Sequence, residues 1–187
     1  MKRLFLLYLL FIFTIIGCYK NDNIIEPEEP LNQILFISSF ENDGQPNNNG
    51  WFIYNKSPDN YSTDTPTNGG KFSLCLKGDT LNHFGQLARI ILPGIGGTNT
   101  YKFSFWSKAQ GCTARAGFYP VTSDIPPPEY FKSKTVFDST WSYYSIFNTF
   151  PLTDNDSIAL YLVCNDTLTT DGKVYFDLCK LEKINSK

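Results

Sequence analysis

Histidine is almost absent from this sequence, and the motifs that usually carry catalysis are missing. The one histidine, His83, lies in the segment LNHFGQ, which holds no serine or cysteine nucleophile motif. The chain also lacks G-x-S-x-G, H-E-x-x-H and P-loop sequences, and no spacing of acidic residues indicates the carboxylate pair of a glycosidase. The glycine-rich run GIGG at 94–97 precedes a strand-like segment, so it cannot present a helix N-terminus to phosphate. The sequence therefore predicts a protein that is not an enzyme.

Clustered positive charge and closely spaced cysteine pairs are missing too. Lysine and arginine total 16 against 18 aspartates and glutamates, a net charge of −2, and the basic residues do not gather in any segment. A nucleic-acid-binding surface needs a basic patch, so we expect no nucleic-acid partner. No CxxC spacing occurs, which argues against a structural zinc site.

A long hydrophobic run occurs only at the N-terminus. Two basic residues precede an apolar stretch over 4–16, which is shorter than the roughly 20 residues of a membrane-spanning helix. A positive start, a short apolar core and a small residue before the cut are typical of a secretory signal. Residues 15–18, IIGC, resemble a bacterial lipobox, which implies a signal peptide over 1–17 and an acylated Cys18. The alternative is an ordinary cleaved signal with an incidental cysteine.

Residues 18–33, CYKNDNIIEPEEPLNQ, are polar and acidic and include two prolines. Such a segment buries too little apolar area to order itself, so we expect a flexible tether. The remaining residues, 34–187, suit one domain in length. The lipobox implies a place in the cell envelope, with the lipid anchor in the outer membrane and the domain facing the periplasm or the cell exterior. Membrane contact is then limited to the lipid anchor.

Four cysteines remain in the domain: Cys75, Cys112, Cys164 and Cys179. An oxidising compartment permits two disulfides, and four cysteines allow three pairings. Four thiols are the alternative, because a domain of this size builds its own core without covalent staples. The sequence alone does not select one of these pairings.

The apolar residues of the domain occur in short, alternating segments. The segments are LFISSF, KFSLCLKG, QLARIIL, TYKFSFWSKA, TARAGFY, WSYYSIFNTF, SIALYLVCN and KVYFDLCKLEKI. They are rich in β-branched and aromatic residues and are separated by Gly, Pro, Asn and Asp. Tyr101, Phe103 and Phe105 alternate with more polar neighbours, and no segment shows a sustained helical period. This pattern predicts an all-β, antiparallel, two-sheet sandwich.

A set of sequence landmarks follows a fixed order along this domain. They are Phe40-Glu41, Trp51, GGKFSL at 69–74, LPG at 92–94, YKFSFWSKA at 101–109, WSYYSIFNTF at 141–150 and VYFDL at 174–178. Their order resembles the jelly-roll carbohydrate-binding modules of the family 4, 9 and 22 type on bacterial xylanases and glucanases. The resemblance spans 34–181 and implies a galactose-binding-domain-like jelly roll. Two departures are Leu178, where those modules have a second Asp, and the longer spacing that GIGGTNT introduces.

The same resemblance implies a structural calcium ion. In those modules the Glu that closes the first strand and the Asp of the last strand converge on calcium, together with backbone carbonyls. Carried over, the ligands are Glu41, Asp177, the carbonyl of Lys71, and Ser39 or its carbonyl. Calcium takes six to eight oxygen ligands, and a carboxylate within the apolar run VYFDLC needs a partner. The alternative is a pair of acids at a solvated sheet edge, or acids paired with Lys or Arg.

Aromatic residues make up 16% of the chain, more than the core obviously demands. Sugar sites stack aromatic faces on pyranose rings and hold hydroxyls with a few polar groups. We expect Trp51, Trp106 and Trp141 to be core residues, because large aromatics usually are. The candidate ligand-binding residues are Tyr54, Tyr61, Arg115, Tyr119, Tyr130 and Phe131, with Asn55 and Gln86 as further polar candidates. Ordinary surface aromatics are the alternative.

These features together predict a non-catalytic lipoprotein of the cell envelope that binds a polysaccharide or oligosaccharide and contains structural calcium. The alternative is an adhesin, or an accessory subunit of a surface complex, that binds an envelope protein rather than sugar. The metal and sugar predictions both require the first and last strands to lie side by side, so that Glu41 comes close to Asp177.

Overall fold

A computed structural model of the chain describes residues 32–78, 85–165 and 172–185. All of them belong to one compact unit, Asn32–Lys187. They form strands and two short 3₁₀ turns, without an α-helix in these ranges, and none of the described helical turns is long and apolar enough to cross a membrane. The predicted signal peptide, the lipidation site Cys18 and His83 lie outside the described residues.

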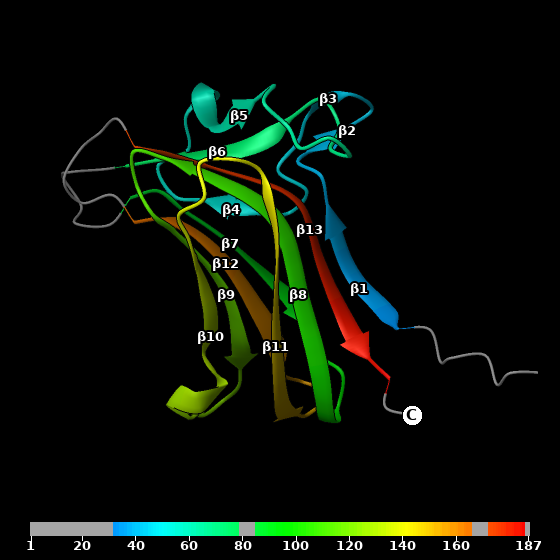
Figure 1. The fold of residues 1–187 in the computed structure, drawn as a ribbon. Coiled ribbons are helices and arrows are strands. Elements are labelled where there is room, and N and C mark those ends of the chain that lie inside the picture. Colours follow the sequence, from blue (N-terminus) through cyan, green and yellow to red (C-terminus); the bar gives the residue numbers. More distant parts are fainter. Residues whose placement is uncertain (1–31, 79–84, 166–171, 186–187) are drawn as a thin grey trace, which may run out of the picture. The chain divides into compact units, whose positions relative to one another are not determined.

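Two antiparallel sheets build the domain (Figure 1). The β8 sheet has the strand order β11-β8-β13-β6-β5, with β1 also paired to β13, and the β9 sheet has the order β10-β9-β12-β7-β4. The bounds are β1 Gln33–Ser38, β2 Glu41–Asn42, β3 Gln45–Pro46, β4 Phe52–Ile53, η2 Pro58–Asn60, β5 Tyr61–Ser62, β6 Ser73–Lys77, β7 Leu87–Pro93, β8 Gly97–Gln110, β9 Ala114–Val121, η3 Pro128–Tyr130, β10 Lys132–Val136, β11 Ser142–Leu152, β12 Ser157–Cys164 and β13 Lys173–Ile184. The all-β, two-sheet sandwich predicted from the alternating segments is confirmed.

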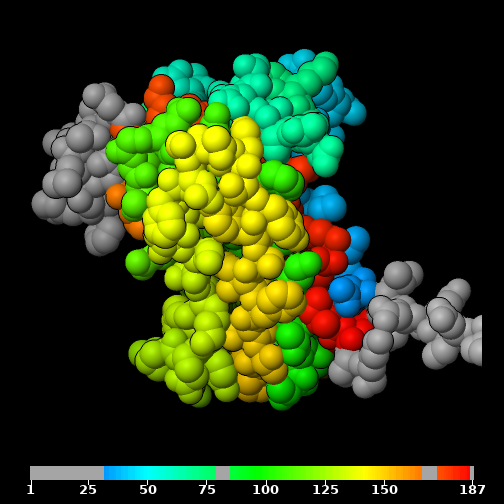
Figure 2. Space-filling model, in the orientation of Figure 1, coloured from blue at the N-terminus to red at the C-terminus, as the bar shows by residue number. Residues whose placement is uncertain are grey.

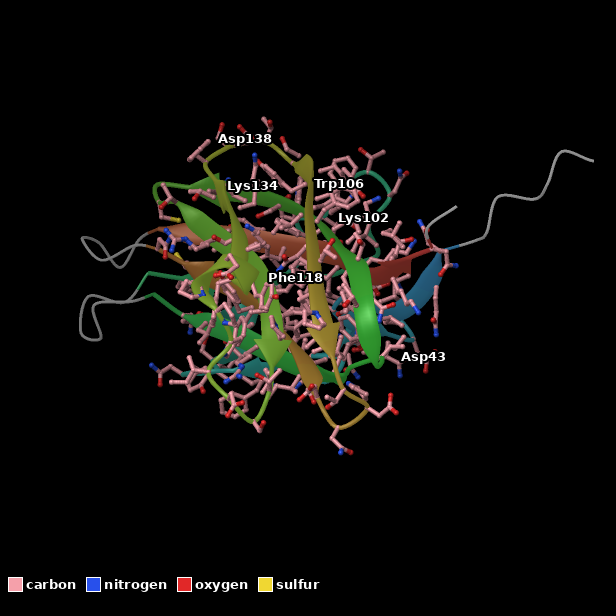
Figure 3. All side chains as sticks on the ribbon, turned by 90° about the horizontal axis from the view of Figure 1, so that it is seen from below. Asp43, Lys102, Trp106, Phe118, Lys134 and Asp138 are labelled. Atoms are coloured by element: carbon pink, nitrogen blue, oxygen red, sulfur yellow. The ribbon has the colours of Figure 1, made fainter. Side chains whose placement is uncertain are left out.

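Side-chain alternation fills the space between the two sheets. Phe103 and Phe105 of β8 are fully buried, and the ring of Phe103 meets that of Phe118 from β9 at 6.2 Å. Figure 3 shows Phe118 between the sheets. Tyr101 stacks on Phe150 of β11 with 5.0 Å between the ring centroids. Burying each such side chain stabilises the fold by about 1.5–3 kcal/mol.

The three tryptophans do not share one environment. Trp51 is fully buried and packs its ring against Phe36 and Phe40, as predicted. The prediction is wrong for Trp106 and Trp141, which are half-buried on the outer side of the β8 sheet. Strand alternation explains Trp106, because the inward positions of β8 are taken by the residues on either side of it.

The first and last strands lie side by side, as required by the predicted site. β1 pairs antiparallel with the second half of β13, so that Ser38 lies opposite Cys179 (Figures 1 and 2). Both strands lose regular geometry just beyond this pair. Phe40 and Leu178 have left-handed φ angles of 56° and 49°, and the register of β13 against β8 shifts at Leu178. This β-bulge turns the chain next to Asp177.

Three consecutive asparagines hold the loop after β1 in place. The side chain of Asn47 accepts a hydrogen bond from the amide of Asn49 (2.7 Å), and that of Asn48 donates to the carbonyl of Trp51 (2.9 Å). The side chain of Asn49, whose φ is 48°, donates to Ser38 Oγ at 3.3 Å. Asparagine tolerates left-handed backbone and bonds its own loop, so this run fixes the end of β1.

Of the four domain cysteines, two lie with their sulfur atoms close together. The Sγ atoms of Cys112 and Cys164 are 3.6 Å apart. Cys75 and Cys179 are both buried in the β8 sheet.

Candidate functional site

The two acids predicted to bind calcium lie together beyond the end of β1. Glu41 Oε2 accepts hydrogen bonds from the backbone amides of Lys71 (2.5 Å) and of the residue after it (3.1 Å). A Cβ atom on Gly70 would overlap the Glu41 carboxylate, and one on Gly69 would overlap Asp177 Oδ2. The two consecutive glycines therefore let the chain pass close against both acids.

Asp177 is the buried member of the acid pair. Its side chain is fully buried, its Oδ1 accepts a hydrogen bond from the Leu178 amide at 2.7 Å, and its Oδ2 has no hydrogen-bond partner among the described residues. Burial raises the pKa of Asp177 to about 7, the Leu178 amide opposes this shift, and the charge of Glu41 adds to it. A carboxyl group in this position needs either a proton or a cation.

The acid pair fits a hard cation such as calcium. It offers carboxylate oxygens from two strands, one of which is buried without a protein donor. Within the described ranges no group of three or more His, Cys, Asp or Glu side chains could hold a metal ion, so the other ligands would be carbonyls, hydroxyls or water. Lys71 contacts Glu41 through its amide, and the described contacts do not join Ser39 to either acid. The ligand roles of the Lys71 carbonyl and of Ser39 stay predictions.

The outer face of the β9 sheet carries a row of aromatic and arginine side chains. Alternation along β9 buries Phe118 and turns Tyr119 outward. In the next strands, the register places Tyr161 of β12 beside Arg89 of β7, and Arg89 beside Phe52 of β4. The row therefore crosses the sheet.

The rings of this row contact one another. Tyr119 stacks on Phe131 with 4.6 Å between centroids and an interplanar angle of 22°, and the ring of Tyr161 lies 6.1 Å away on its other side. The guanidinium carbon of Arg89 lies 5.8 Å from the Tyr119 centroid. A Cβ atom on Gly117 would overlap the hydroxyl end of Tyr161, so glycine at this position lets the Tyr161 ring lie across β9.

Two hollows lie on either side of Arg89 and share it as a wall. One hollow, of about 240 Å³, is lined by Tyr119 and the turn at 120–126. The other, of about 250 Å³, is lined by Phe52 and Tyr54, whose rings meet edge to face at 4.8 Å. Each is smaller than the roughly 300–1,000 Å³ of a pocket that encloses a whole small molecule. The pair therefore suits successive units of an extended ligand.

Arg89 itself is half-buried and incompletely satisfied. Its Nε atom is buried and has no hydrogen-bond partner among the described residues. The ion pairs found within the described part of the chain do not include Arg89, although Asp124 lines the same hollow. Because that atom is out of contact with solvent, a ligand meets Arg89 through the parts of the side chain that line the two hollows.

The structure brings four of the six predicted ligand-binding residues to this face and places two elsewhere. The four are Tyr54, Arg115, Tyr119 and Phe131. Tyr61 lies in β5 of the other sheet, with Lys56 Nζ 5.8 Å from its ring centroid. Tyr130 is half-buried, and its ring packs 6.2 Å from that of Phe150 at the edge of the core.

The further polar candidates, Asn55 and Gln86, belong to an internal network. Gln86 Oε1 accepts hydrogen bonds from the Asn60 side chain (2.7 Å) and the Lys77 amide (3.0 Å), and its Nε2 donates to the Asn55 carbonyl (2.9 Å). These contacts join the segment after β4 to β6 and β7. Gln86 therefore has a structural role, because its hydrogen bonds connect these segments.

Three members of the row, Arg89, Tyr161 and Phe52, were missed by the sequence analysis. The available signal was Arg89 within the apolar segment QLARIIL. Strand alternation places this arginine opposite to the face of Ala88 and Ile90, which are buried.

A second group of cation and aromatic side chains lies on the outer side of the β8 sheet, but its cation is buried and already paired. Lys108 is only 7% exposed, and its ammonium group forms an ion pair with Asp64. The same nitrogen lies 4.8 Å from the ring centroid of Tyr175 and 5.6 Å from that of Trp141, whose Nε1 donates to Asp64 at 2.9 Å. Burial raises the pKa of Asp64, but the hydrogen bonds from Lys108 and Trp141 outweigh it, and the pKa lies below its usual range.

Sequence comparison does not place the chain in a known family: no protein-family profile and no curated protein sequence matches it. Solved structures do match. The chain is similar to the CBM22-1 xylan-binding domain of Xyn10C from Paenibacillus barcinonensis, at 15% identity and a TM-score of 0.53, over 83% of this chain and 97% of that domain. It is also similar to a candidate sugar-binding protein from Bacteroides thetaiotaomicron, at 11% identity and a TM-score of 0.52, over 84% and 96% of the two chains.

The similarity extends in part to a larger protein. The enzymatically active domain of tailspike protein 4 of bacteriophage CBA120 matches at 13% identity and a TM-score of 0.54, over 72% of this chain but 19% of that chain. Taken together, the matches show that the domain has the galactose-binding-like jelly-roll fold of carbohydrate-binding modules, as the sequence landmarks predicted. At these identities the likeness concerns the fold.

Proposed function

We propose that this domain binds an oligosaccharide or polysaccharide on the outer face of the β9 sheet without cleaving it. The observation that carries the proposal is the row formed by Phe131, Tyr119, Tyr161, Arg89 and Phe52, with a hollow on each side of the arginine. This face is referred to below as the platform. The jelly-roll fold shared with sugar-binding modules supports the same proposal.

The dimensions and chemistry of the platform favour an extended glycan. It spans five strands, and four strand spacings of about 4.8 Å give a length of about 19 Å. Aromatic rings offer flat apolar surfaces for the C–H faces of sugar rings, and the arginine and tyrosine hydroxyls supply hydrogen bonds to polar substituents. The rings of the platform contact one another and Arg89, which restricts their movement, so binding costs little further ordering of side chains.

The acids near the platform do not suggest hydrolysis. Of the residues that line the two hollows, only Asp124 is acidic. A glycosidase uses two carboxyl groups about 5–10 Å apart across the scissile bond. A single rim carboxylate supports a binding role and not a catalytic one.

The proposal includes a structural calcium ion held by Glu41 and Asp177. Calcium would neutralise the buried Asp177 carboxylate and join the end of β1 to the bulge of β13 and to the segment that carries Lys71. A bound cation supplies charge neutralisation and cross-linking at this position, so its contribution is to stability rather than to sugar contact. The platform lies on the other sheet, and the residues of the acid pair do not line either hollow.

The proposed setting is the cell envelope. The lipobox-like sequence at 15–18 supports a lipid anchor on Cys18, followed by a tether that ends where β1 begins at Gln33. A tethered binding domain of this kind would hold a glycan near the outer membrane, for a transporter or a surface complex to take over.

The test is a glycan array followed by calorimetry with any polysaccharide that binds. Tyr119→Ala should abolish or strongly weaken binding, while Tyr61→Ala, a tyrosine change on the other sheet, should leave it unchanged. Release of shortened products during the measurement would contradict the non-catalytic proposal. Failure to bind any glycan, with an envelope protein retained instead, would favour the adhesin or assembly alternative.

A further inference from the structure

The centre of the proposed platform carries a positive charge that the described protein does not neutralise. Arg89 stands between the two hollows, its Nε atom is buried without an acceptor, and none of the described ion pairs includes it. A second arginine, Arg115, is exposed on the same outward face of β9. The lining of the two hollows contains one carboxylate, Asp124, and Arg115 lies outside both linings. Arg89 therefore stands at the midpoint of the platform without an ion-pair partner among the described residues.

The neighbouring Tyr119 ring holds the guanidinium group of Arg89 in place. The Tyr119 ring lies 5.8 Å from the guanidinium carbon, which limits movement of the planar group. Arginine presents its N–H donors in a fixed fork that matches the two oxygens of a carboxylate or a sulfate group. A guanidinium held beside an aromatic ring and open to a hollow on each side is preorganised to receive such a group.

We propose that the ligand of the platform is an acidic glycan, with Arg89 receiving the carboxylate of a uronic acid or a sulfate ester. The neighbouring rings stack on the sugar units before and after the charged one. This inference rests on the proposed glycan-binding function and specifies its ligand class. A neutral glycan would offer only hydroxyl groups to Arg89, and hydrogen bonds between neutral and charged partners are weaker than a bidentate ionic pair.

The experiment compares pairs of polymers with the same backbone, one with the anionic group and one without it. The full-length protein is titrated with polygalacturonate and with its methyl ester, and separately with dextran sulfate and with dextran. We expect the charged member of at least one pair to bind at least tenfold more tightly, and its advantage to shrink as salt is raised. The two pairs distinguish a carboxylate from a sulfate as the recognised group. A broad array of neutral plant and bacterial polysaccharides is run in parallel.

Variants assign the effect to Arg89. Arg89→Gln should remove the preference for the charged polymer, and Arg89→Lys should restore only part of it, because lysine keeps the charge but not the fork. Lys173→Gln is the matched control, since it removes one exposed positive charge from the other sheet. This control should retain the full preference.

The outcomes separate this inference from the proposed function. Equal or tighter binding of the neutral polymers would overturn the acidic ligand and leave glycan binding in place. A preference that survives Arg89→Gln would overturn the role of Arg89. Absence of binding to every charged and neutral polymer would overturn the proposed function itself, and the ligand class with it.

A second inference comes from the sulfur atoms of Cys112 and Cys164, which are 3.6 Å apart. Cys112 follows β8 and is half-buried, and Cys164 is the last residue of β12. The backbones on either side are already joined, because the Asn165 amide donates to the Thr113 carbonyl at 2.8 Å. We infer that these two cysteines form a disulfide, which selects one pair among the three pairings that the sequence allows.

The oxidant for this step is a small-molecule disulfide such as glutathione disulfide. The more exposed Cys112 thiolate attacks one glutathione sulfur and releases a glutathione thiolate. The Cys164 thiolate then attacks the Cys112 sulfur of the mixed disulfide and releases the second glutathione. The protein loses two protons and two electrons, and glutathione disulfide is reduced to two thiols.

Mass spectrometry of unreduced peptides tests this pair on the full-length protein after incubation with glutathione disulfide. We expect a cross-linked peptide that contains Cys112 and Cys164, also in a Cys75→Ser/Cys179→Ser variant that keeps only this pair. Persistent glutathione adducts without the cross-link, or a cross-link from Cys112 to Cys75, would overturn the inference.

Discussion

Two groups of side chains combine a cation with aromatic rings, one on each sheet, and they differ in how the cation is neutralised. On the β8 sheet, Lys108 is almost fully buried, lies against two rings and is paired with Asp64. On the β9 sheet, Arg89 is half-buried beside Tyr119, has an unbonded Nε atom and borders two hollows. Both groups place a cation beside aromatic rings, but among the described residues only the cation of the β8 group forms an ion pair with a carboxylate.

This difference separates stability from binding. A buried cation that has its own counter-ion contributes to the fold, and removing the counter-ion leaves a buried charge behind. Arg89 borders two hollows and has no ion-pair partner among the described residues, so it is available to a ligand. The Glu41 and Asp177 pair extends the contrast, because the described ion pairs give neither acid a lysine or arginine partner. Changes on the β8 side should therefore alter stability, and changes on the platform should alter binding.

The largest effect is expected at Asp177, through pH. Its pKa is about 7 in the folded domain against the ordinary aspartate value of 3.8, so between these values the folded state holds a proton that the unfolded chain has released. Stability of the metal-free domain should therefore fall as pH rises through this window, by about 3 kcal/mol between pH 5 and pH 8, at about 1.4 kcal/mol per pKa unit. Denaturant unfolding in EDTA at several pH values measures this fall.

Calcium should reverse the pH effect, because it binds the ionised carboxylate and stabilises the folded state. Asp177→Asn should remove both the pH dependence and the response to calcium, while Asp154→Asn, an exposed acid elsewhere, should change neither. A pH profile that is the same with calcium and with EDTA would contradict the proposed metal site.

The next largest effect is expected for the enclosed Lys108 group. Asp64→Asn removes the counter-ion and should destabilise the domain by about 1–3 kcal/mol, because the lysine ammonium stays buried without its charged partner. Arg89→Gln should change stability less, by about 0.5–1 kcal/mol, which is the size of a partly exposed cation–π contact. Urea unfolding of both variants tests the contrast directly. Equal losses of unfolding free energy would contradict the difference between the two cations.

On the platform, Tyr119→Ala should affect binding more than stability. Its ring contacts Phe131, Tyr161 and Arg89, so its removal eliminates the centre of the stacking surface. We expect glycan affinity to fall at least tenfold, which is about 1.4 kcal/mol, with a smaller loss of unfolding free energy. Calorimetry and thermal unfolding of the same sample measure the two quantities.

The smallest effect is expected for Tyr61→Ala. Tyr61 was a candidate from the sequence, but it lies in β5 of the other sheet. Glycan affinity should stay within about twofold of the unaltered protein, because this variant removes no platform contact. A loss as large as that for Tyr119→Ala would place the ligand on the β8 side and invert the comparison.

The fold could be predicted because it depends on patterns within single segments. Alternation in TYKFSFWSKA and neighbouring segments identified the strands, and the order of landmarks indicated the jelly roll. The pairing of the first and last strands followed from the same order, and with it the meeting of Glu41 and Asp177. Both features can be predicted from one sequence, because the alternation lies within a segment and the landmarks follow one another along the chain.

The platform was only partly predictable, because it depends on which strands are neighbours. Tyr119 and Phe131 were identified as candidates, but Arg89 and Tyr161 become part of one surface only through the register of β12 against β7 and β9. Tyr130 shows the opposite error, since a loop tyrosine packs its ring against Phe150. Cross-strand neighbours come from tertiary pairing, which segment patterns do not specify.

The most direct measurement is mapping of the bound face by NMR, with a polysaccharide identified on the array titrated into isotopically labelled protein. If the ligand binds the platform, we expect chemical-shift changes to concentrate at residues 87–91, 115–121 and 159–163 of the β9 sheet and at the side-chain N–H of Arg89. Changes centred on Lys108 and Trp141 of the β8 side, with the platform signals unmoved, would contradict binding at the platform.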